Sequence, residues 1–481
     1  MADIRYPWGY TTALKGPAVD LKSSVVEVVA FDTPSLGDRS YLVHDGRYAV
    51  VIDPQRDTDR VADVVAAHGL TITYVLETHI HNDYVTGGYA LAQRVGAVYV
   101  VNADDTVGYQ RLAVHDGDVL ESGPRMRIRV VHTPGHTFTH LSYALEVDGR
   151  ATAVFTGGSL LYGSTGRPDL LGAQHAETLA RHQHASAHRL VAELPADTQI
   201  YPTHGFGSFC AATQATGLSS TLANEARVNP ALTQAEEDYV AALLAGLDAY
   251  PAYYTHMGPA NAAGPTPVDL SPPHVADPAE LRRRVHAGEW VVDLRNRTAF
   301  AAGHLPGTLN FALHDSFVTY MGWLIPWGTP VTLLGETADE VAAAQRDLAR
   351  IGIDRPAAAA TGKPEDWAGG AGLGSFPTAT FDDLAALRGG HHAHPIVLDV
   401  RRHDERRASH VDGTMHIPIH ELPARLDEVP ADRQVWVHCA AGYRASIAAS
   451  LLHRAGRDVV AIHDDYTAAH TAGLPIVVQA T

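Results

Sequence analysis

The sequence predicts an α/β protein made of about three domains. Short apolar strands alternate with helical segments along the chain, an order of elements that produces parallel sheets covered by helices. The chain has 481 residues, more than one hydrophobic core usually serves. Its second half contains one pattern twice, which indicates two copies of a smaller domain.

The first predicted domain spans residues 1–260. Apolar and β-branched residues predict strands at 24–30, 49–52, 72–76, 97–101, 127–131 and 153–155. The helical pattern covers 58–68 and 84–95. Pro, Gly and Ala dominate residues 258–273, which we interpret as a linker.

The repeat follows this linker. Val291–Arg295 resembles Val397–Arg401, and in both places the Asp precedes a His by 11 positions and a Gly by 14. Apolar strands at 331–334 and 435–438 then lead into helical segments at 340–351 and 446–455. We expect two α/β domains, the first copy at 271–375 and the second copy at 376–481.

Composition limits the classes of partner. The formal charge of −18 disfavours nucleic acid and anionic membrane surfaces. The chain has two cysteines, Cys210 and Cys439, and no signal peptide or transmembrane run is visible from residue 1 onward. We therefore expect a cytoplasmic protein, and the Arg-, Ala- and Gly-rich composition is typical of a GC-rich bacterial genome. A homo-oligomer is also expected.

The segment Cys439–Arg444 reads Cys-Ala-Ala-Gly-Tyr-Arg and lies between a strand and a helix expected to begin near Ala445. Main-chain N–H groups converge in such a loop and stabilise a thiolate or a persulfide anion. Gly442 permits the tight turn, and Arg444 can add a forked cationic donor. Cys439, Gly442 and Arg444 are therefore the candidate catalytic residues. The alternative is an inert buried cysteine, which is also how we interpret Cys210.

This loop resembles the active-site loop of rhodaneses, which carry sulfur on the cysteine. A phosphatase loop would need one more residue between Cys and Arg. In the first copy Gly335 stands at the Cys position, Ala338 at the Gly position and Glu340 at the Arg position. We expect that copy to be inert in sulfur transfer and to serve in packing or spacing.

A cluster of histidines lies in the first domain. His79 and His81 follow a predicted strand, His136 follows Thr-Pro-Gly, and His204 precedes Gly. Residues two apart on an extended segment point the same way, so His79 and His81 can converge on one metal ion. His79, His81 and His136 are the candidate metal ligands, with Asp83 and His204 as weaker candidates.

The arrangement resembles the metallo-β-lactamase superfamily, which implies an αββα sandwich for the first domain. Gly166-Arg167-Pro168-Asp169 and the attached rhodanese-like copies resemble its persulfide dioxygenase branch. That resemblance implies mononuclear Fe(II) and a thiol persulfide substrate oxidised to sulfite. Arg167 and Tyr84 are the candidate substrate-binding residues. The expected iron ligands fall on His79, His136 and Gly158.

Gly158 departs from the family pattern, because a carboxylate ligand is missing there. Tyr84 also replaces a motif His, which disfavours a binuclear site. Three interpretations remain: an iron site with water, His81 or another anion in place of the carboxylate; a three-histidine Zn(II) site suited to thioester hydrolysis; or a domain without metal.

We therefore expect a sulfane-sulfur enzyme, a sulfurtransferase fused to a persulfide dioxygenase-like domain. Its expected partners are a small thiol persulfide, thiosulfate or sulfite. The alternatives are a zinc hydrolase with an attached rhodanese domain, and a metal-free first domain with only the sulfurtransferase active.

Overall fold

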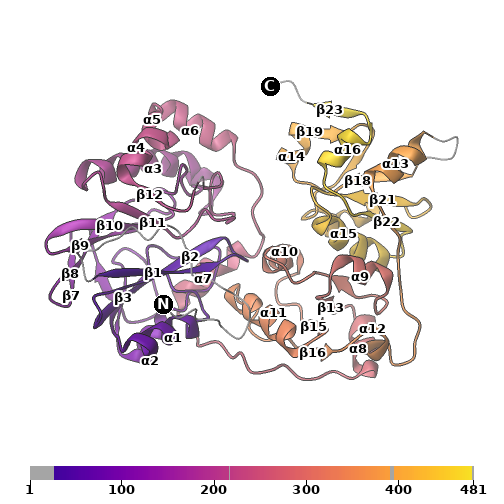
Figure 1. Ribbon diagram of the computed structural model, residues 1–481, viewed down its shortest axis with the longest axis horizontal. Coiled ribbons are helices and arrows are strands. Elements are labelled where there is room, and N and C mark those ends of the chain that lie inside the picture. The colour runs from indigo at the N-terminus through magenta and orange to yellow at the C-terminus, as the bar shows by residue number, and fades with distance from the viewer. Residues whose placement is uncertain (1–25, 216, 390–394, 479–481) are drawn as a thin grey trace. The chain divides into compact units, whose positions relative to one another are not determined.

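The computed structural model describes residues 26–215, 217–389 and 395–478 (Figure 1). The expectation of no signal peptide over residues 1–22 lies outside the described residues. The chain forms two compact units, one of residues 1–269 with 348–354 and one of residues 270–347 with 355–481. The boundaries predicted for three domains stay predictions.

Two six-stranded sheets form the centre of the first unit. The first sheet contains, in order, β1 (Glu27–Thr33), β2 (Asp38–His44), β3 (Tyr48–Ile52), β4 (Thr71–Leu76), β5 (Val98–Asn102) and β6 (Leu112–Val114). Strands β1 to β3 pair antiparallel, whereas β3 to β6 pair parallel.

The second sheet has the order β12-β11-β10-β9-β8-β7. Its strands are β7 (Val119–Ser122), β8 (Met126–His132), β9 (Leu141–Val147), β10 (Arg150–Gly157), β11 (Gln199–Pro202) and β12 (Ser220–Thr221). Only the β10–β11 pairing is parallel. The loops after β8, β10 and β11 of this sheet carry His136, Gly158 and His204, and the loop after β4 of the first sheet carries His79 and His81.

Helices cover the outer faces of both sheets. The sheets share one buried core between them, which includes Tyr41, Tyr143 and Phe155. Apolar residues of α1 (Asp59–His68) and α2 (Gly88–Val95) pack on the first sheet. The second sheet is covered by α3 (Ala176–Glu193), α4 (Leu222–Val228), α5 (Pro230–Thr233) and α6 (Glu236–Ala245). This order of layers is the predicted αββα sandwich.

The predicted linker is wrong at its start. Residues 258–263 belong to helix α7 (Tyr254–Ala263), although Pro259 lies inside it. Asn261 explains why the helix persists: its buried amide donates to the carbonyls of His81 and Tyr84 and accepts from the N–H of Thr86. The helix is thereby fixed against the loop that carries the histidines.

Two parallel sheets form the second unit, one in each predicted copy. The first copy has the order β14 (Leu309–Asn310), β13 (Trp290–Asp293), β15 (Val331–Gly335) and β16 (Ala358–Thr361). The second copy has the order β17 (Thr378–Ala379), β22 (Val459–Ile462), β21 (Val435–His438), β18 (Ile396–Asp399) and β20 (Met415–His416). Strands β19 (Ser409–Val411) and β23 (Ile476–Val478) form a separate antiparallel pair.

Helices flank these sheets in both copies. The first copy contains α8 (Pro278–His286), α9 (Arg297–Ala302), α10 (Phe317–Leu324), α11 (Ala338–Arg350) and α12 (Pro364–Ala368). The second contains α13 (Phe381–Arg388), α14 (His403–Ala408), α15 (Tyr443–Arg454) and α16 (Thr467–Thr471).

The internal repeat extends to side-chain contacts. Arg295 pairs with Asp293 at 2.7 Å, and Arg401 pairs with Asp399 at 2.8 Å. Each arginine also donates to a carbonyl eight residues later. The sequence repeat is therefore a structural repeat. Among the described residues of the whole chain, no helix has the length and apolar character that crossing a membrane requires.

Candidate functional site

The loop after β21 holds Cys439 at the start of helix α15. Gly442 adopts φ 87° and is the N-cap of this helix, which begins at Tyr443, two residues earlier than expected. The N–H of Gly442 donates to the Cys439 Sγ at 3.1 Å. The thiol is 2% exposed, so it lies at the positive end of a helix dipole in a largely desolvated position.

Arg444 is positioned by an acidic residue that sequence reasoning missed. Its Nη1 and Nη2 atoms donate to the two carboxylate oxygens of Glu405 at 2.5 and 2.7 Å. Burial opposes the charge of Arg444, but the Glu405 carboxylate outweighs burial and raises the pKa of the guanidinium. Glu405 lies on α14 within a charged run that carried no distinguishing signal.

The corresponding loop of the first copy already contains an anion. The carboxylate of Glu340 accepts the N–H of Glu336 at 2.7 Å and that of Thr337 at 3.4 Å. A Cβ placed on Gly335 would lie 3.3 Å from the same carboxylate oxygen. Main-chain N–H groups of this loop therefore already face a carboxylate.

The first copy also packs on the loop of Cys439. Tyr443 donates to the carbonyl of Ala312 at 3.0 Å. Arg297 Nε donates to His463 Nδ1 at 2.6 Å, and a Cβ on Gly442 would lie 3.1 Å from that Nε. These contacts are consistent with a packing role for the first copy.

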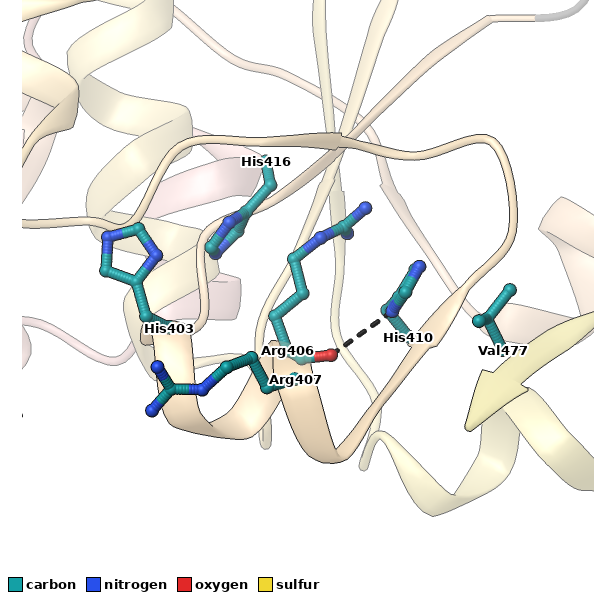
Figure 2. A pocket seen from close by; sticks show the side chains of 6 residues that line it. All are labelled: His403, Arg406, Arg407, His410, His416 and Val477. Carbon is teal, nitrogen blue, oxygen red and sulfur yellow. Dashed lines mark hydrogen bonds between the residues drawn. The ribbon is translucent and has the colours of Figure 1, made fainter. Parts of the chain in front are cut away.

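A pocket of about 440 Å³ opens elsewhere on the second copy (Figure 2). Figure 2 shows His403, Arg406, Arg407, His410, His416 and Val477 around it. His410 Nδ1 lies 3.1 Å from the Arg406 carbonyl, and the Arg406 side chain donates to Thr414. None of the predicted catalytic residues lines this pocket.

In the first unit, the five predicted metal-ligand candidates are brought together and are all buried: His79, His81, Asp83, His136 and His204. The ring centroid of His79 lies 4.1 Å from that of His81, 4.8 Å from that of His136 and 5.4 Å from that of His204. His204, predicted as a weaker candidate, belongs to three of the four groups of described residues whose geometry could hold a metal ion.

Hydrogen bonds determine which ring nitrogen of His136 and His79 is free. His136 Nδ1 lies 2.9 Å from the carbonyl of Arg167, which can only accept, so Nδ1 carries the proton. The buried Nε2 of His136 has no hydrogen-bond partner. His79 Nδ1 lies 2.9 Å from the hydroxyl of Thr78, which itself donates to Asp53. Both histidines therefore keep a lone pair on Nε2.

Two carboxylates hold His204, and sequence reasoning missed one of them. His204 Nδ1 lies 2.9 Å from Asp38 and 3.1 Å from Asp83. Burial and the neighbouring Asp83 raise the pKa of Asp38 to about 8. Burial opposes protonation of His204, but Asp83 and Asp38 outweigh it and raise its pKa. One oxygen of each carboxylate has no hydrogen-bond partner.

Tyr84 fixes His81 through stacking and a hydrogen bond. The rings lie 4.3 Å apart, and the hydroxyl is 3.0 Å from His81 Nε2. That nitrogen also faces Asp53 at 3.2 Å and Glu77 at 3.3 Å. Burial opposes the charge of His81, but these carboxylates raise its pKa to about 9. Tyr84 thus contacts a candidate ligand.

The side chain of Arg167 pairs with Asp169 at 2.7 Å, and its main chain holds His136. A fifth histidine, His140, was not predicted. Its Nε2 accepts the N–H of Gly158 at 3.0 Å and its Nδ1 lies 3.0 Å from Thr133 Oγ1, so neither ring nitrogen is free to bind a metal.

The ligand set that the family resemblance implies does not fit this chain. Gly158 supplies no carboxylate, and the ring of His136 fills the space beside it: a Cβ on Gly158 would lie 2.6 Å from His136 Cγ. The three-histidine set His79, His81 and His136 is not among the metal-competent groups of the described residues, because their free nitrogens do not converge.

Comparisons with known proteins match this architecture. The metallo-beta-lactamase superfamily model matches residues 39–204, and the rhodanese-like domain model matches residues 380–471. Persulfide dioxygenase ETHE1 of Homo sapiens is 30% identical over 226 residues, which is 47% of this chain and 80% of the human protein. A cytoplasmic hydroxyacylglutathione hydrolase of Arabidopsis thaliana is 34% identical over 181 residues, 37% of this chain and 67% of the plant protein.

Among solved structures, a metallo-beta-lactamase from Staphylococcus aureus aligns with a TM-score of 0.63 and 28% identity, over 70% of this chain and 99% of that one. The fold and the site define a metallo-β-lactamase-type domain followed by a rhodanese-like domain. The chain belongs to the metallo-β-lactamase superfamily, and its relatives there include persulfide dioxygenases.

Proposed function

We propose that this chain handles sulfane sulfur and that the Sγ atom of Cys439 carries it. The main support is the hydrogen bond that the Gly442 N–H donates to the Cys439 Sγ at the N-terminus of α15. Such a donor stabilises negative charge that develops on this sulfur during the reaction, and it would hold a persulfide anion for the same reason.

The proposed reaction has two halves. The Cys439 thiolate attacks the outer sulfur of a persulfide or thiosulfate donor, and the S–S bond breaks with its electron pair on the leaving thiolate or sulfite. An acceptor such as cyanide, sulfite or a thiolate then attacks the outer sulfur of Cys439–S–S⁻ and releases the Cys439 thiolate. Arg444 keeps its fork on Glu405, so its role is to position the loop and offset negative charge.

For the first unit we propose a small thiol persulfide as ligand. Relatives named persulfide dioxygenase, at 30% and 32% identity, support this substrate class. We assign no oxidation step to this unit, because Gly158 removes the carboxylate of the expected ligand set. Both cysteines are free, which fits a reducing compartment such as the cytoplasm.

A hydrolase is the second candidate, since relatives named hydroxyacylglutathione hydrolase reach 34% identity. Elemental analysis of the purified protein is combined with assays of glutathione persulfide binding, oxygen uptake and thioester hydrolysis. Zinc with thioester hydrolysis supports the hydrolase, and persulfide binding without hydrolysis supports the persulfide ligand. Iron with oxygen uptake on the persulfide would show that the unit oxidises its ligand despite Gly158.

The test of sulfur transfer is thiosulfate:cyanide transfer by the full chain and by Cys439→Ser. We expect the variant to lose the activity entirely. Ala455→Ser, at the exposed far end of α15, is the matched control and should transfer sulfur like the parent chain. Undiminished transfer by Cys439→Ser rules the proposal out.

A further inference from the structure

Three buried histidines of the first unit, His79, His136 and His204, use Nδ1 for contacts with the protein, which leaves Nε2 as the nitrogen that could bind a ligand. Nδ1 of His136 is tied to a carbonyl and Nδ1 of His79 to a hydroxyl, while Nδ1 of His204 faces Asp38 and Asp83. Carboxylates at Nδ1 are the usual arrangement behind a histidine that binds metal through Nε2. The Nε2 atoms of His79 and His204 lie 3.4 Å apart.

That separation is informative. Two nitrogen ligands at about 2.1 Å from a tetrahedral ion are about 3.4 Å apart. Two lone pairs at this distance repel each other unless a proton or a cation lies between them. A proton shared by His79 and His204 would remove this repulsion. It would still leave the buried Nε2 of His136 without a hydrogen-bond partner.

Cys210 brings a sulfur atom close to two of these histidines, His136 and His204. Its Sγ lies within 4.8 Å of ligand nitrogens of His136 and His204, and the residue is fully buried. The loop folds back from His204 through Gly205 and Gly207, whose φ values of 116° and 107° suit glycine. The Cys210 carbonyl then accepts the N–H of Arg167 at 2.8 Å, which fixes the turn beside His136.

Charge gives a reason for a thiolate here. A divalent ion held by two histidines and one carboxylate carries a net charge of about +1, and loss of the carboxylate at Gly158 would leave it at about +2. The thiolate of Cys210 restores the missing negative charge from another direction. Deprotonation accompanies binding, because a cysteine that ligates metal does so as thiolate and its proton leaves for solvent.

We propose that His136, His204 and Cys210, with His79 beside them, form a nitrogen–sulfur site for a thiophilic divalent cation of the Zn²⁺ or Fe²⁺ class. The site differs from the one expected from the family in its anionic ligand, which is a thiolate from the loop after β11. It does not depend on sulfur transfer at Cys439.

The chain's cysteine content makes the test direct. Cys439→Ser leaves Cys210 as the only thiol, so a thiolate signal in that variant must come from Cys210. After removal of metal with a chelator, the full-length variant is titrated with Co²⁺ as the probe. We expect one equivalent to bind with a thiolate-to-cobalt charge-transfer band in the near ultraviolet.

Cys210→Ser in the same Cys439→Ser background is the companion variant, and its circular dichroism and melting temperature report whether it folds. It should lose the charge-transfer band and bind Co²⁺ at least about tenfold more weakly. X-ray absorption of the zinc-loaded Cys439→Ser protein should show one sulfur neighbour of zinc. Cobalt bound without the band, zinc with only nitrogen and oxygen neighbours, or no stoichiometric binding by Cys439→Ser each overturns the proposal.

Discussion

The Nε2 atoms of His79 and His204 lie 3.4 Å apart, although one residue follows a strand of the first sheet and the other a strand of the second sheet. Asp38 and Asp83 hold the opposite nitrogen of His204. Without a cation, the raised pKa of His204 lets its imidazolium donate across this gap. With a cation, the same carboxylates orient the ring and increase its basicity as a ligand.

Asp38→Asn tests this support. The amide keeps the size of the side chain but, unlike Asp38, cannot ionise beside His204 when a cation binds, so we expect metal affinity to fall by about 10- to 100-fold. Competition with a chromophoric chelator measures the change. Asp63→Asn, on the exposed face of α1, is the control. Equal affinity in the two variants would mean that Asp38 does not support the site.

Gly158→Asp restores the residue type that the family resemblance implies, and we expect it to destabilise the first unit. Its Cβ would overlap the His136 ring, and such overpacking costs about 1–3 kcal/mol. Chemical denaturation measures the cost, with Gly372→Asp as a control because no atom lies within 4 Å of the added Cβ. A gain in stability together with iron binding would show that the His136 ring readily moves aside.

Gly335→Cys tests why the first copy lacks activity. In the Cys439→Ser background we expect no sulfur transfer, because the Glu340 carboxylate already accepts the loop amides and repels a second anion. Adding Glu340→Gln should increase alkylation of the new thiol by iodoacetamide at neutral pH. An equal alkylation rate with and without Glu340→Gln would exclude this explanation.

His438, next to Cys439, makes stability depend on acidity. Burial lowers its pKa to about 4 despite the neighbouring Asp399, and its ring nitrogens have no hydrogen-bond partner. Between pH about 6.5 and 4 the unfolded chain binds a proton that the folded chain does not, so stability falls by up to about 1.4 kcal/mol per pH unit. His438→Leu should flatten this fall in denaturant unfolding, while exposed His470→Leu should leave it unchanged.

The sequence predicted the layers because periodicity and strand chemistry are local. The strand before Cys439 was predicted with the observed ends, since Val435–His438 is apolar and bounded by loops. Strand β2 was missed because Asp38, Arg39, Ser40 and His44 interrupt its apolar pattern, although every residue in it is buried. Asp38, Arg39 and Ser40 are paired by contacts with His204, Asp32 and the carbonyl of Asp53, which periodicity does not encode.

In the candidate sites, too, contacts between residues close in sequence were predicted and contacts between distant residues were not. Cys439 and Gly442 lie within one short loop, so sequence spacing predicted their meeting. Asp38 and Glu405 come from distant segments and carry no motif, so only the fold reveals that they hold His204 and Arg444. The metal-competent groups of the described residues include His204 in three of four cases, and none of them includes position 158, where the His136 ring fills the space of a Cβ.

Sulfur carriage by Cys439 is tested most directly by intact-protein mass spectrometry after brief exposure of the full chain to thiosulfate or glutathione persulfide. We predict the addition of one sulfur atom, located by peptide mapping on Cys439 and removed by cyanide. A chain whose mass does not change, or whose added sulfur maps to Cys210 alone, would contradict the account.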